Sequence, residues 1–152
     1  MIKSEDMKTR LMFLFIALSV SATAQEKTLP APIAPYSPIV RAGNTYYLSG
    51  QIPRIPETGA LIRGDIQKAT KQVMENIWRV LKQNDLDFGN VVRCTVYLKN
   101  MDDYQAVNKV YGSYFKEPYP ARVAVQVARL PLDADIEISC IAVKNRRNQT
   151  ME

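Results

Sequence analysis

The sequence predicts an α+β domain in which five short strands form one mixed sheet and two amphipathic helices cover a single face of it. The first observation is length, because 152 residues suffice for one hydrophobic core and an N-terminal extension. The second is periodicity, which is helical in two segments and alternating or β-branched in five others. The third is the order β-β-α-β-α-β-β, since two helices cannot cover both faces of such a sheet.

The first two strands are expected at residues 39–42 and 45–49, which are short and apolar. Gly43-Asn44 separates them, and a glycine-containing pair between two apolar runs is typical of a β-hairpin. Residues 51–64 are rich in Pro and Gly and are expected to form a loop.

A first helix is expected from Asp65 to about Asn84. Its apolar residues recur at helical spacing and form one face, with Ile66, Ala69, Val73, Ile77, Val80 and Leu81. The remaining positions are mostly Lys, Arg, Gln and Glu, so the helix is expected to have its other side in water.

A second helix is expected to reach about Phe115, with Asp102 and Asp103 as candidate N-caps. Its apolar and aromatic residues repeat every three to four positions, at Tyr104, Val107, Tyr111 and Tyr114. Pro118 and Pro120 follow, and neither can continue a helix.

Three further strands are expected at residues 91–98, 122–127 and 136–143. In the first of them the residues alternate, with Val92, Cys94, Val96 and Leu98 on one side and Arg93, Thr95 and Tyr97 on the other. In the last two, the residues expected to face the helices are Val123, Val125 and Val127, and Ile136, Ile138 and Cys140. The opposite sides of the last two strands carry Arg122, Ala124 and Gln126, and Glu137, Ser139, Ile141 and Val143. This second face is too apolar to stay fully hydrated, and its Arg and Glu predict a subunit interface with a polar pocket.

The first 24 residues have the order of a secretory signal peptide. Lys8 and Arg10 precede an apolar block at residues 11–20, and small residues then lead to Ala24. This block is too short to span a bilayer, which needs about 20 residues. We therefore expect cleavage after Ala24, export to the periplasm and no stable membrane span in the mature chain. An uncleaved anchor and a buried core helix are the alternatives.

The mature chain is expected to have three parts. Residues 25–38 form an extended, Pro-rich lead-in, residues 39–144 form the domain, and residues 145–152 form a polar basic tail. Residues 25–143 carry 14 Lys or Arg and 12 Asp or Glu, so their net charge is only +2, whereas the whole chain is +5. This weak charge does not predict a nucleic-acid partner.

The residue types present also limit the chemistry. The chain has no His, which excludes His-dependent triads, His general bases and the common His-containing zinc sites. Its two Cys, Cys94 and Cys140, lie in apolar alternating runs without CxxC spacing, so buried thiols are expected and neither a metal nor a redox role is predicted. A disulfide in an oxidising compartment is the alternative.

Three segments of the chain resemble the Rid (YjgF-like) family of reactive imine/enamine deaminases. They are SGQIPRIPETG at 49–59, MDDYQAVNKVYGSYF at 101–115, and PYPARVAVQVARLP at 118–131, which is followed by Ile136-Glu137-Ile138. The lead-in APIAPYSP at 31–38 matches more loosely, and the likeness spans about residues 30–144.

This resemblance implies a chorismate-mutase-like two-layer sandwich that assembles as a homotrimer, with three sheets forming a central barrel and the sites in clefts between subunits. It implies hydrolysis of 2-imino or 2-enamino acids to 2-oxo acids and ammonia. Since an iminium carbon is already electrophilic, neither a cofactor nor a metal is expected. Non-catalytic binding of a small carboxylate, a chaperone-like role and, less strongly, ribonuclease activity are the alternatives.

The resemblance also implies roles for five residues. Arg122 matches the residue that binds the substrate carboxylate, or forms an interface ion pair. Glu137 matches the acid that holds the attacking water, or forms a salt bridge to Arg122 or a Lys. Tyr36 matches a tyrosine that closes the site, or is an interface aromatic. Gly50 matches a position where backbone approaches the ligand, or is a simple turn. Asn108 matches a residue that borders the site, or is an ordinary polar group on a helix flank.

This chain departs from the family pattern at four positions. Ala124 stands where many relatives have Cys, Gln126 and Ser139 stand where acids are frequent, and Ala34 stands where Gly is common. Arg122 and Glu137 are retained, but the departures put the charge of the pocket and its substrate preference in question.

Overall fold

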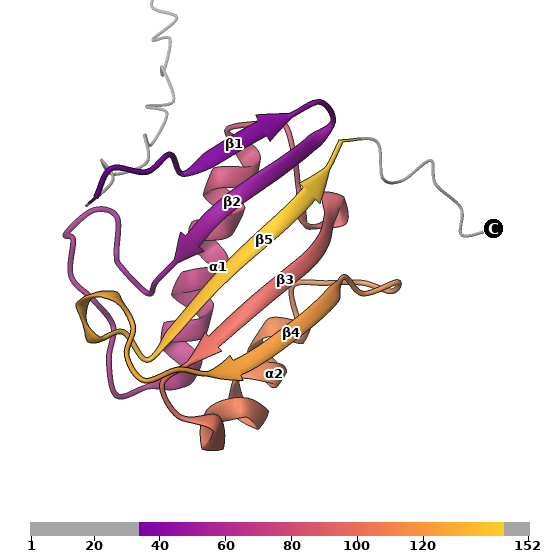
Figure 1. Ribbon diagram of the computed structural model, residues 1–152. Coiled ribbons are helices and arrows are strands. Elements are labelled where there is room, and N and C mark those ends of the chain that lie inside the picture. Colours follow the sequence, from indigo (N-terminus) through magenta and orange to yellow (C-terminus); the bar gives the residue numbers. More distant parts are fainter. Residues whose placement is uncertain (1–33, 145–152) are drawn as a thin grey trace, which may run out of the picture.

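The computed structural model describes residues 34–144, so the predicted signal peptide, residues 25–33 of the lead-in and the tail at 145–152 lie outside the described residues. Within this range the chain forms one sheet with two α-helices on one face (Figure 1). The strands are β1 (Ile39–Ala42), β2 (Thr45–Gln51), β3 (Val91–Leu98), β4 (Ala121–Gln126) and β5 (Ile136–Val143). The helices are α1 (Ile66–Lys82) and α2 (Tyr104–Gly112), and the 3-10 turns are η1 (Phe88–Asn90), η2 (Met101–Asp103) and η3 (Pro131–Asp133).

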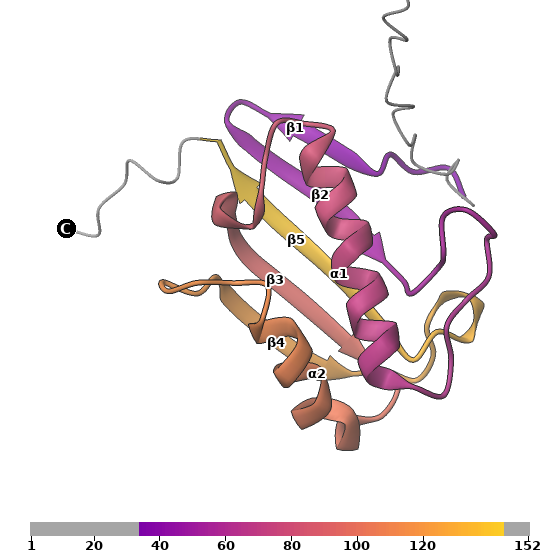
Figure 2. The ribbon, with the colours of Figure 1, turned by 180° about the vertical axis from the view of Figure 1, so that it is seen from behind.

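The strand order across the sheet is β1-β2-β5-β3-β4. Neighbouring strands are antiparallel except β3 and β4, which are parallel and are connected through α2. Both helices lie behind the sheet as Figure 1 shows it, and Figure 2 shows them from their own side. The other face of the sheet is uncovered in the described chain, and we call it the open face. The predicted α+β class is confirmed, and the bounds of all five strands agree with the prediction to within two residues.

Helix α1 matches its prediction because its apolar stripe has one surface to cover. Asp65 caps the helix, since its carboxylate accepts a hydrogen bond from the backbone N–H of Lys68 at 3.0 Å. Arg79 and Lys82 lie in the last turn, where positive charge is favourable near the free carbonyl groups. The buried face consists of Ala69, Thr70, Val73, Met74, Asn76, Ile77, Val80 and Leu81. Each large apolar side chain on it contributes roughly 1.5–3 kcal/mol by leaving water.

The start of α2 differs from the prediction. It is preceded by η2, where the Asn100 side chain accepts a hydrogen bond from the backbone N–H of Asp102 at 3.1 Å. Asp103 makes no side-chain capping bond to the helix. Of the two predicted N-cap candidates, Asp103 therefore occupies the N-cap position of α2 without a capping hydrogen bond, whereas Asp102 lies within η2, whose own cap is Asn100.

The end of α2 also comes earlier than predicted, at Gly112 rather than near Phe115. The rings of Tyr114 and Phe115 pack instead against Phe88 of η1, with centroids 5.4 and 5.1 Å from its own. This aromatic contact between distant segments outweighs the local periodicity that predicted three more helical residues.

Strand β3 begins with an irregularity that shifts its phase. The pairing with β5 slips between Val91 and Arg93. As a result Val91 is fully buried and Val92 is only half-buried, which is the reverse of the prediction. From Cys94 onward the predicted alternation is confirmed.

Strand β4 faces the other way from the prediction. Val123 and Val125 are 41% and 38% exposed and lie on the open face, whereas Arg122 is on the helix side. The parallel register sets this phase, because Arg122 is paired with Cys94, whose side chain is buried on the helix side. The alternation of valines with Arg122, Ala124 and Gln126 shows which residues share a side, but it does not show which of the two sides faces the helices.

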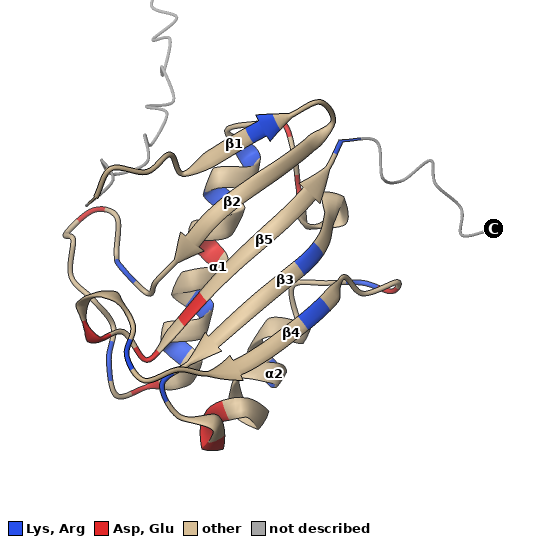
Figure 3. Cartoon of the chain, in the orientation of Figure 1, with Lys and Arg blue, Asp and Glu red and all other residues tan. Residues whose placement is uncertain are grey.

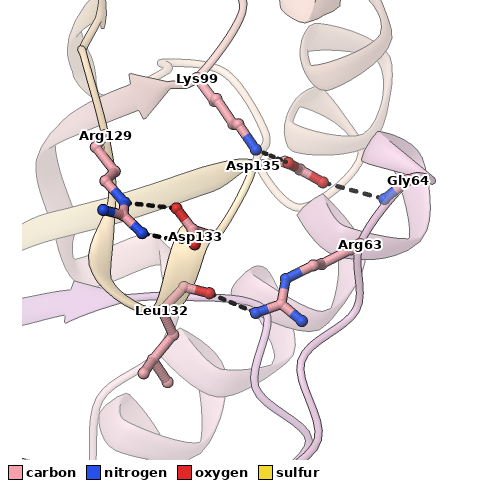
Figure 4. Close-up of polar contacts among 7 residues, drawn as sticks. All are labelled: Arg63, Gly64, Lys99, Arg129, Leu132, Asp133 and Asp135. Atoms are coloured by element: carbon pink, nitrogen blue, oxygen red, sulfur yellow. Dashed lines mark hydrogen bonds and ion pairs between the residues drawn. The ribbon is translucent and has the colours of Figure 1, made fainter.

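The turn that leads into β5 is held by a cluster of polar contacts (Figure 4). Asp135 forms an ion pair with Lys99 at 3.5 Å and accepts a hydrogen bond from the backbone N–H of Gly64 at 3.1 Å. Arg129 binds both carboxylate oxygens of Asp133, at 2.6 and 2.8 Å. Since Glu137 follows Asp135 by two residues, this turn sets where Glu137 enters the open face.

Asp135→Ala is expected to lower the free energy of unfolding by about 1–2 kcal/mol, because the Gly64 N–H loses its acceptor. Asp135→Asn keeps an acceptor for this N–H and loses only the ion pair with Lys99. Because Lys99 is half-exposed, the free energy of unfolding of this variant is expected to fall by less than about 1 kcal/mol. Urea unfolding of the two variants measures the difference. Equal losses would mean that charge, and not the hydrogen bond, holds this turn.

Within residues 34–144, no helix has the length and hydropathy needed to cross a membrane.

Candidate functional site

The structure separates the predicted site residues into two groups on opposite faces of the sheet. Arg122 and Asn108 lie on the helix side, between β4 and α2, whereas Glu137 and Gly50 lie on the open face, on β5 and β2. The prediction that Arg122 and Glu137 share one face is therefore wrong for a single chain, and the two do not form an ion pair within it. The cause is the reversed phase of β4.

The strands of the sheet carry few charged residues, as Figure 3 shows by the few blue and red segments on them. Glu137 is the only acidic residue in the five described strands, and Arg41, Arg93 and Arg122 are the only basic ones. A charged side chain on a sheet that packs against apolar surface is unfavourable unless it has a partner. Arg122 and Glu137 therefore each need a specific environment.

Two tyrosines of α2 provide that environment for Arg122. The guanidinium donates a hydrogen bond from Nη2 to the Tyr104 hydroxyl at 3.0 Å. Its central carbon lies 5.5 Å from the centre of the Tyr104 ring and 4.8 Å from the centre of the Tyr111 ring. Such cation–π contacts hold the planar group in place without neutralising its charge. No carboxylate forms an ion pair with it among residues 34–144, so most of its donors can serve an anion.

A cleft of about 330 Å³ opens beside this guanidinium. It is lined by Asn108, Tyr111, Tyr119, Pro120 and Arg122. The Asn108 Oδ1 and the Tyr111 hydroxyl oxygen are buried and have no hydrogen-bond partner within the described part of the chain. Buried polar atoms are normally paired, so these two are placed to bind a group that residues 34–144 do not supply.

Tyr111 is in its neutral form at this site. Burial, and next the adjacent Cys94 thiol, raise the pKa of Tyr111 far above its ordinary value. Its hydroxyl therefore keeps its proton at neutral pH and can donate a hydrogen bond. Beside Arg122, such a donor suits the second oxygen of a carboxylate.

The second group is built around Glu137 and Gly50. Glu137 lies opposite Tyr97 of β3, and its carboxylate reaches across the backbone of Gly50 in β2. A Cβ atom on Gly50 would overlap the Glu137 Oε1, so only glycine lets the carboxylate lie there. The pairing of β2 with β5 is irregular between Leu48 and Gln51, which places Gly50 inside a bulge.

Glu137 is half-buried, and burial raises its carboxyl pKa above the ordinary value. A higher pKa makes the carboxylate a stronger base once it is ionised. Within residues 34–144 no Lys or Arg forms an ion pair with it, so its charge is not neutralised inside one chain.

Tyr36 lies in the chain just before β1 and is 43% exposed. Its neighbour Ser37 is tied to β2, because the Ser49 hydroxyl donates a hydrogen bond to the Ser37 carbonyl at 2.7 Å. The backbone N–H of Ser49 donates to the Pro38 carbonyl at 3.0 Å. These bonds bring the backbone of the lead-in alongside Ser49, the residue that precedes Gly50 in β2.

The open face, on which Glu137 lies, is partly apolar. Its exposed large side chains include Tyr47, Val123 and Val125. A hollow of about 320 Å³ on it is lined by Tyr47, Leu48, Arg93, Thr95, Ser139, Cys140 and Ile141. Among the described residues, no group of three or more His, Cys, Asp or Glu side chains could hold a metal ion.

Sequence reasoning missed Tyr104 and Tyr111 as the residues that hold the Arg122 guanidinium. It assigned them only to the apolar stripe of the second helix. Their separation of seven residues places them on one helix face, two turns apart, which is the signal that could have identified a platform for a cation.

Comparison with known proteins agrees with this architecture. The model of the family described as endoribonuclease L-PSP matches residues 26–144. A RutC family protein of Pyrococcus horikoshii is 50% identical over 115 residues, which cover 76% of this chain and 91% of that protein. A mouse protein named 2-iminobutanoate/2-iminopropanoate deaminase is 44% identical over 115 residues, which cover 76% of this chain and 85% of that one.

Among solved structures, RidA from the Antarctic bacterium Psychrobacter sp. PAMC 21119 is 38% identical and superposes with a TM-score of 0.74, covering 78% of this chain and 95% of RidA. A family match over most of the chain and relatives at these identities agree with each other. The chain therefore belongs to the endoribonuclease L-PSP family, which is the Rid (YjgF-like) family that its sequence resembles.

Proposed function

We propose that this protein hydrolyses 2-imino and 2-enamino acids to 2-oxo acids and ammonia. The observation that carries the proposal is the Arg122 cleft, where a guanidinium without a carboxylate partner lies beside the unpaired Tyr111 hydroxyl and Asn108 Oδ1. The guanidinium and the Tyr111 hydroxyl can both donate to a small carboxylate, and the Asn108 Oδ1 can accept a hydrogen bond from the imine or amine N–H of the same molecule. The deaminase name of a relative at 44% identity supports the reaction class.

We also propose that each site is completed by a second subunit. One small substrate cannot contact Arg122 on the helix side and Glu137 on the open face of the same sheet. Strand β4 lies at an edge of the sheet, and the exposed Val123 and Val125 give the open face an apolar area that a second copy can bury. In a cyclic homotrimer the same two surfaces meet at every interface, so each interface carries one equivalent site.

The reaction then needs only positioning and proton transfer. Arg122 binds the substrate carboxylate through two parallel hydrogen bonds, and the Tyr111 hydroxyl donates a third. This orients the imine carbon toward a water molecule held by Glu137 of the other subunit. Tyr36 covers the bound substrate from the lead-in.

Glu137 acts as base and then as acid. It accepts a proton from the water while the oxygen attacks the imine carbon, which gives a tetrahedral carbinolamine. It then returns the proton to the nitrogen and accepts the hydroxyl proton as the carbonyl forms and the C–N bond breaks. The proton that Glu137 now holds passes to the departing ammonia, so ammonium is released and the carboxylate is restored. An enamine enters the same path after protonation at carbon. The protein supplies no electron or metal, because the iminium carbon is already an electrophile.

The decisive experiment follows imine lifetime. An amino-acid oxidase generates 2-imino acids in situ, and semicarbazide traps whatever imine survives. Wild-type protein is expected to suppress semicarbazone formation, whereas Arg122→Ala is expected to lose at least 100-fold in kcat/KM, because it removes the charge-assisted anchor. Lys109→Ala is the control, since Lys109 is an exposed cation next to Asn108 on the same helix.

The same measurement distinguishes the alternative of a binding module. A protein that only binds small carboxylates would bind 2-oxo acids through Arg122. It would leave the lifetime of small, aliphatic and aromatic imino acids unchanged. The ribonuclease named in the family description requires RNA binding that weakens with salt, and the net charge of +2 over residues 25–143 gives little support for it.

The pH dependence of the reaction gives a separate prediction. Glu137 must be ionised to accept a proton, and burial raises its pKa above the ordinary value of a glutamate. The value of kcat/KM is therefore expected to fall as pH falls through this raised pKa, after subtraction of uncatalysed hydrolysis at each pH. Glu137→Gln is expected to remove this acidic limb together with most of the rate. An unchanged limb in that variant would assign it to the substrate.

We propose in addition that residues 1–24 direct export to the periplasm. The proposal rests on the apolar block at 11–20 between basic and small residues. A reporter enzyme that works only outside the cytoplasm, fused after residue 24, is expected to be active. The exported protein is expected to begin at Gln25. A full-length chain that stays in the cytoplasm would contradict it.

A further inference from the structure

The two cysteines of the chain meet at the centre of the sheet. Cys94 of β3 and Cys140 of β5 are directly opposite in the antiparallel pairing. Both are free thiols and both are buried, at 0% and 2% exposure. Their sulfur atoms are 3.1 Å apart. Their place on the helix side of the sheet separates them from the Glu137 carboxylate on the open face.

This geometry satisfies the requirements of a disulfide. Directly opposite residues in an antiparallel pair have Cα atoms about 4.5–5.5 Å apart, and disulfides need about 4.4–6.8 Å. Both side chains leave the sheet on the same side, because opposite residues share a face. The sulfurs need to approach each other by only about 1 Å to reach the bonded separation of about 2.05 Å.

We propose that Cys94 and Cys140 form a cross-strand disulfide when the protein folds in an oxidising environment. The oxidant is a disulfide, either of a small thiol or of an oxidised dithiol protein. One cysteine thiolate attacks it, which forms a mixed disulfide and releases one thiolate. The second cysteine thiolate then attacks the sulfur of the first and releases the other. The cysteine pair loses two protons and two electrons, and the oxidant is reduced to two thiols.

The neighbours of the pair suggest which cysteine attacks when the sheet is nearly formed. The thiol of Cys140, then the Tyr111 hydroxyl and last the Arg122 guanidinium, hold the pKa of Cys94 below its ordinary value. The Cys94 thiol and burial raise the pKa of Cys140. These opposite directions favour Cys94 as the thiolate that attacks first, with Cys140 resolving the mixed disulfide.

The bond would close the segment between Cys94 and Cys140, which contains α2, β4 and the start of β5. Both Arg122 and Glu137 lie inside this segment. Closing a long segment restricts the unfolded chain strongly, which is the main source of disulfide stabilisation in the chain-entropy model. The inference does not depend on the proposed deaminase activity, because it concerns the sheet and not the substrate.

The test begins with the full chain, denatured and reduced, then refolded with and without a low-molecular-weight disulfide. The oxidised protein is expected to lose two hydrogen atoms by intact mass and to show no thiol that an alkylating reagent can modify after denaturation. Its Tm is expected to exceed that of the reduced protein by roughly 10 °C, which is the shift that a typical native disulfide gives in a domain of this size.

Cys94→Ala and Cys140→Ala are the controls. Each keeps one thiol, so oxidation is expected to leave it alkylatable or linked to the small thiol and to give no rise in Tm. The double variant separates the bond from packing, because it lacks both sulfurs and must melt at the same temperature with and without oxidant. Two alkylatable thiols in oxidised wild type, disulfide-linked dimers, or a lower Tm after oxidation would each overturn the proposal.

Discussion

Gly50→Ala is expected to keep its fold and to lose about 100-fold in kcat/KM for imine hydrolysis, the effect of removing a general base. The new Cβ would overlap the Glu137 carboxylate, which is the movable end of a side chain and not backbone. The sheet can therefore remain intact while the carboxylate turns away. Gly50 would then act on the reaction only through the position of Glu137.

A double-mutant cycle measures this dependence. If Gly50→Ala acts only by displacing Glu137, it is expected to lower kcat/KM very little in a protein that already carries Glu137→Gln. The losses in kcat/KM of the two single variants then do not add in the double variant. Gly112→Ala is the matched control, because a Cβ there meets no atom within 4 Å and its φ is not left-handed. Additive losses, or a large fall in Tm for Gly50→Ala, would show that the glycine serves the turn and not the carboxylate.

The sequence predicted the sheet and helices well where one hydrophobic pattern had one solution. Helix α1 has an unbroken apolar stripe and an aspartate cap, and β5 alternates cleanly from Ile136 to Cys140. In both elements, burial of one side determines which residues face the core. The hydrophobic pattern of the sequence therefore agrees with the orientation of the element in the structure.

The prediction failed where the decision was made by distant contacts. In the segment ARVAVQ the valines alternate with Arg122, Ala124 and Gln126, which predicted the valines on the helix side, but the parallel register with β3 placed Arg122 there instead. The tyrosines of α2 made that choice favourable for Arg122, since they give its charge a platform. The irregularity at the start of β3 had no recognisable signal in the sequence, because Val91 and Val92 are identical residues.

This reversal changes how the site must be assembled. The sequence identified Arg122, Glu137, Gly50, Asn108 and Tyr36 through a family resemblance, which names residues but not the chains that provide them. The structure places Arg122 and Asn108 on the helix side of the sheet and Glu137 and Gly50 on the open face. Under the proposed function, each of these two groups is half of a site, and the other half comes from a second subunit.

Two inactive variants are therefore expected to restore activity when their subunits mix. In the proposed trimer, Arg122 and Glu137 of one site come from different subunits. Arg122→Ala and Glu137→Gln each destroy every site in a uniform trimer. After equal random mixing, about one site in four receives both intact side chains, so about a quarter of the wild-type rate should return in a closed three-subunit ring.

Co-refolding the two variants at equal concentration and measuring imine hydrolysis provides this test. The control mixes Arg122→Ala with a chain that carries both changes, which can form no intact site because neither chain has Arg122. Native mass spectrometry must show mixed oligomers in both samples, so that a negative result has one meaning. If mixed trimers form and remain inactive, Arg122 and Glu137 do not complete one site across an interface. If about a quarter of the rate returns only in the first mixture, the two faces of the sheet act on one substrate from two chains.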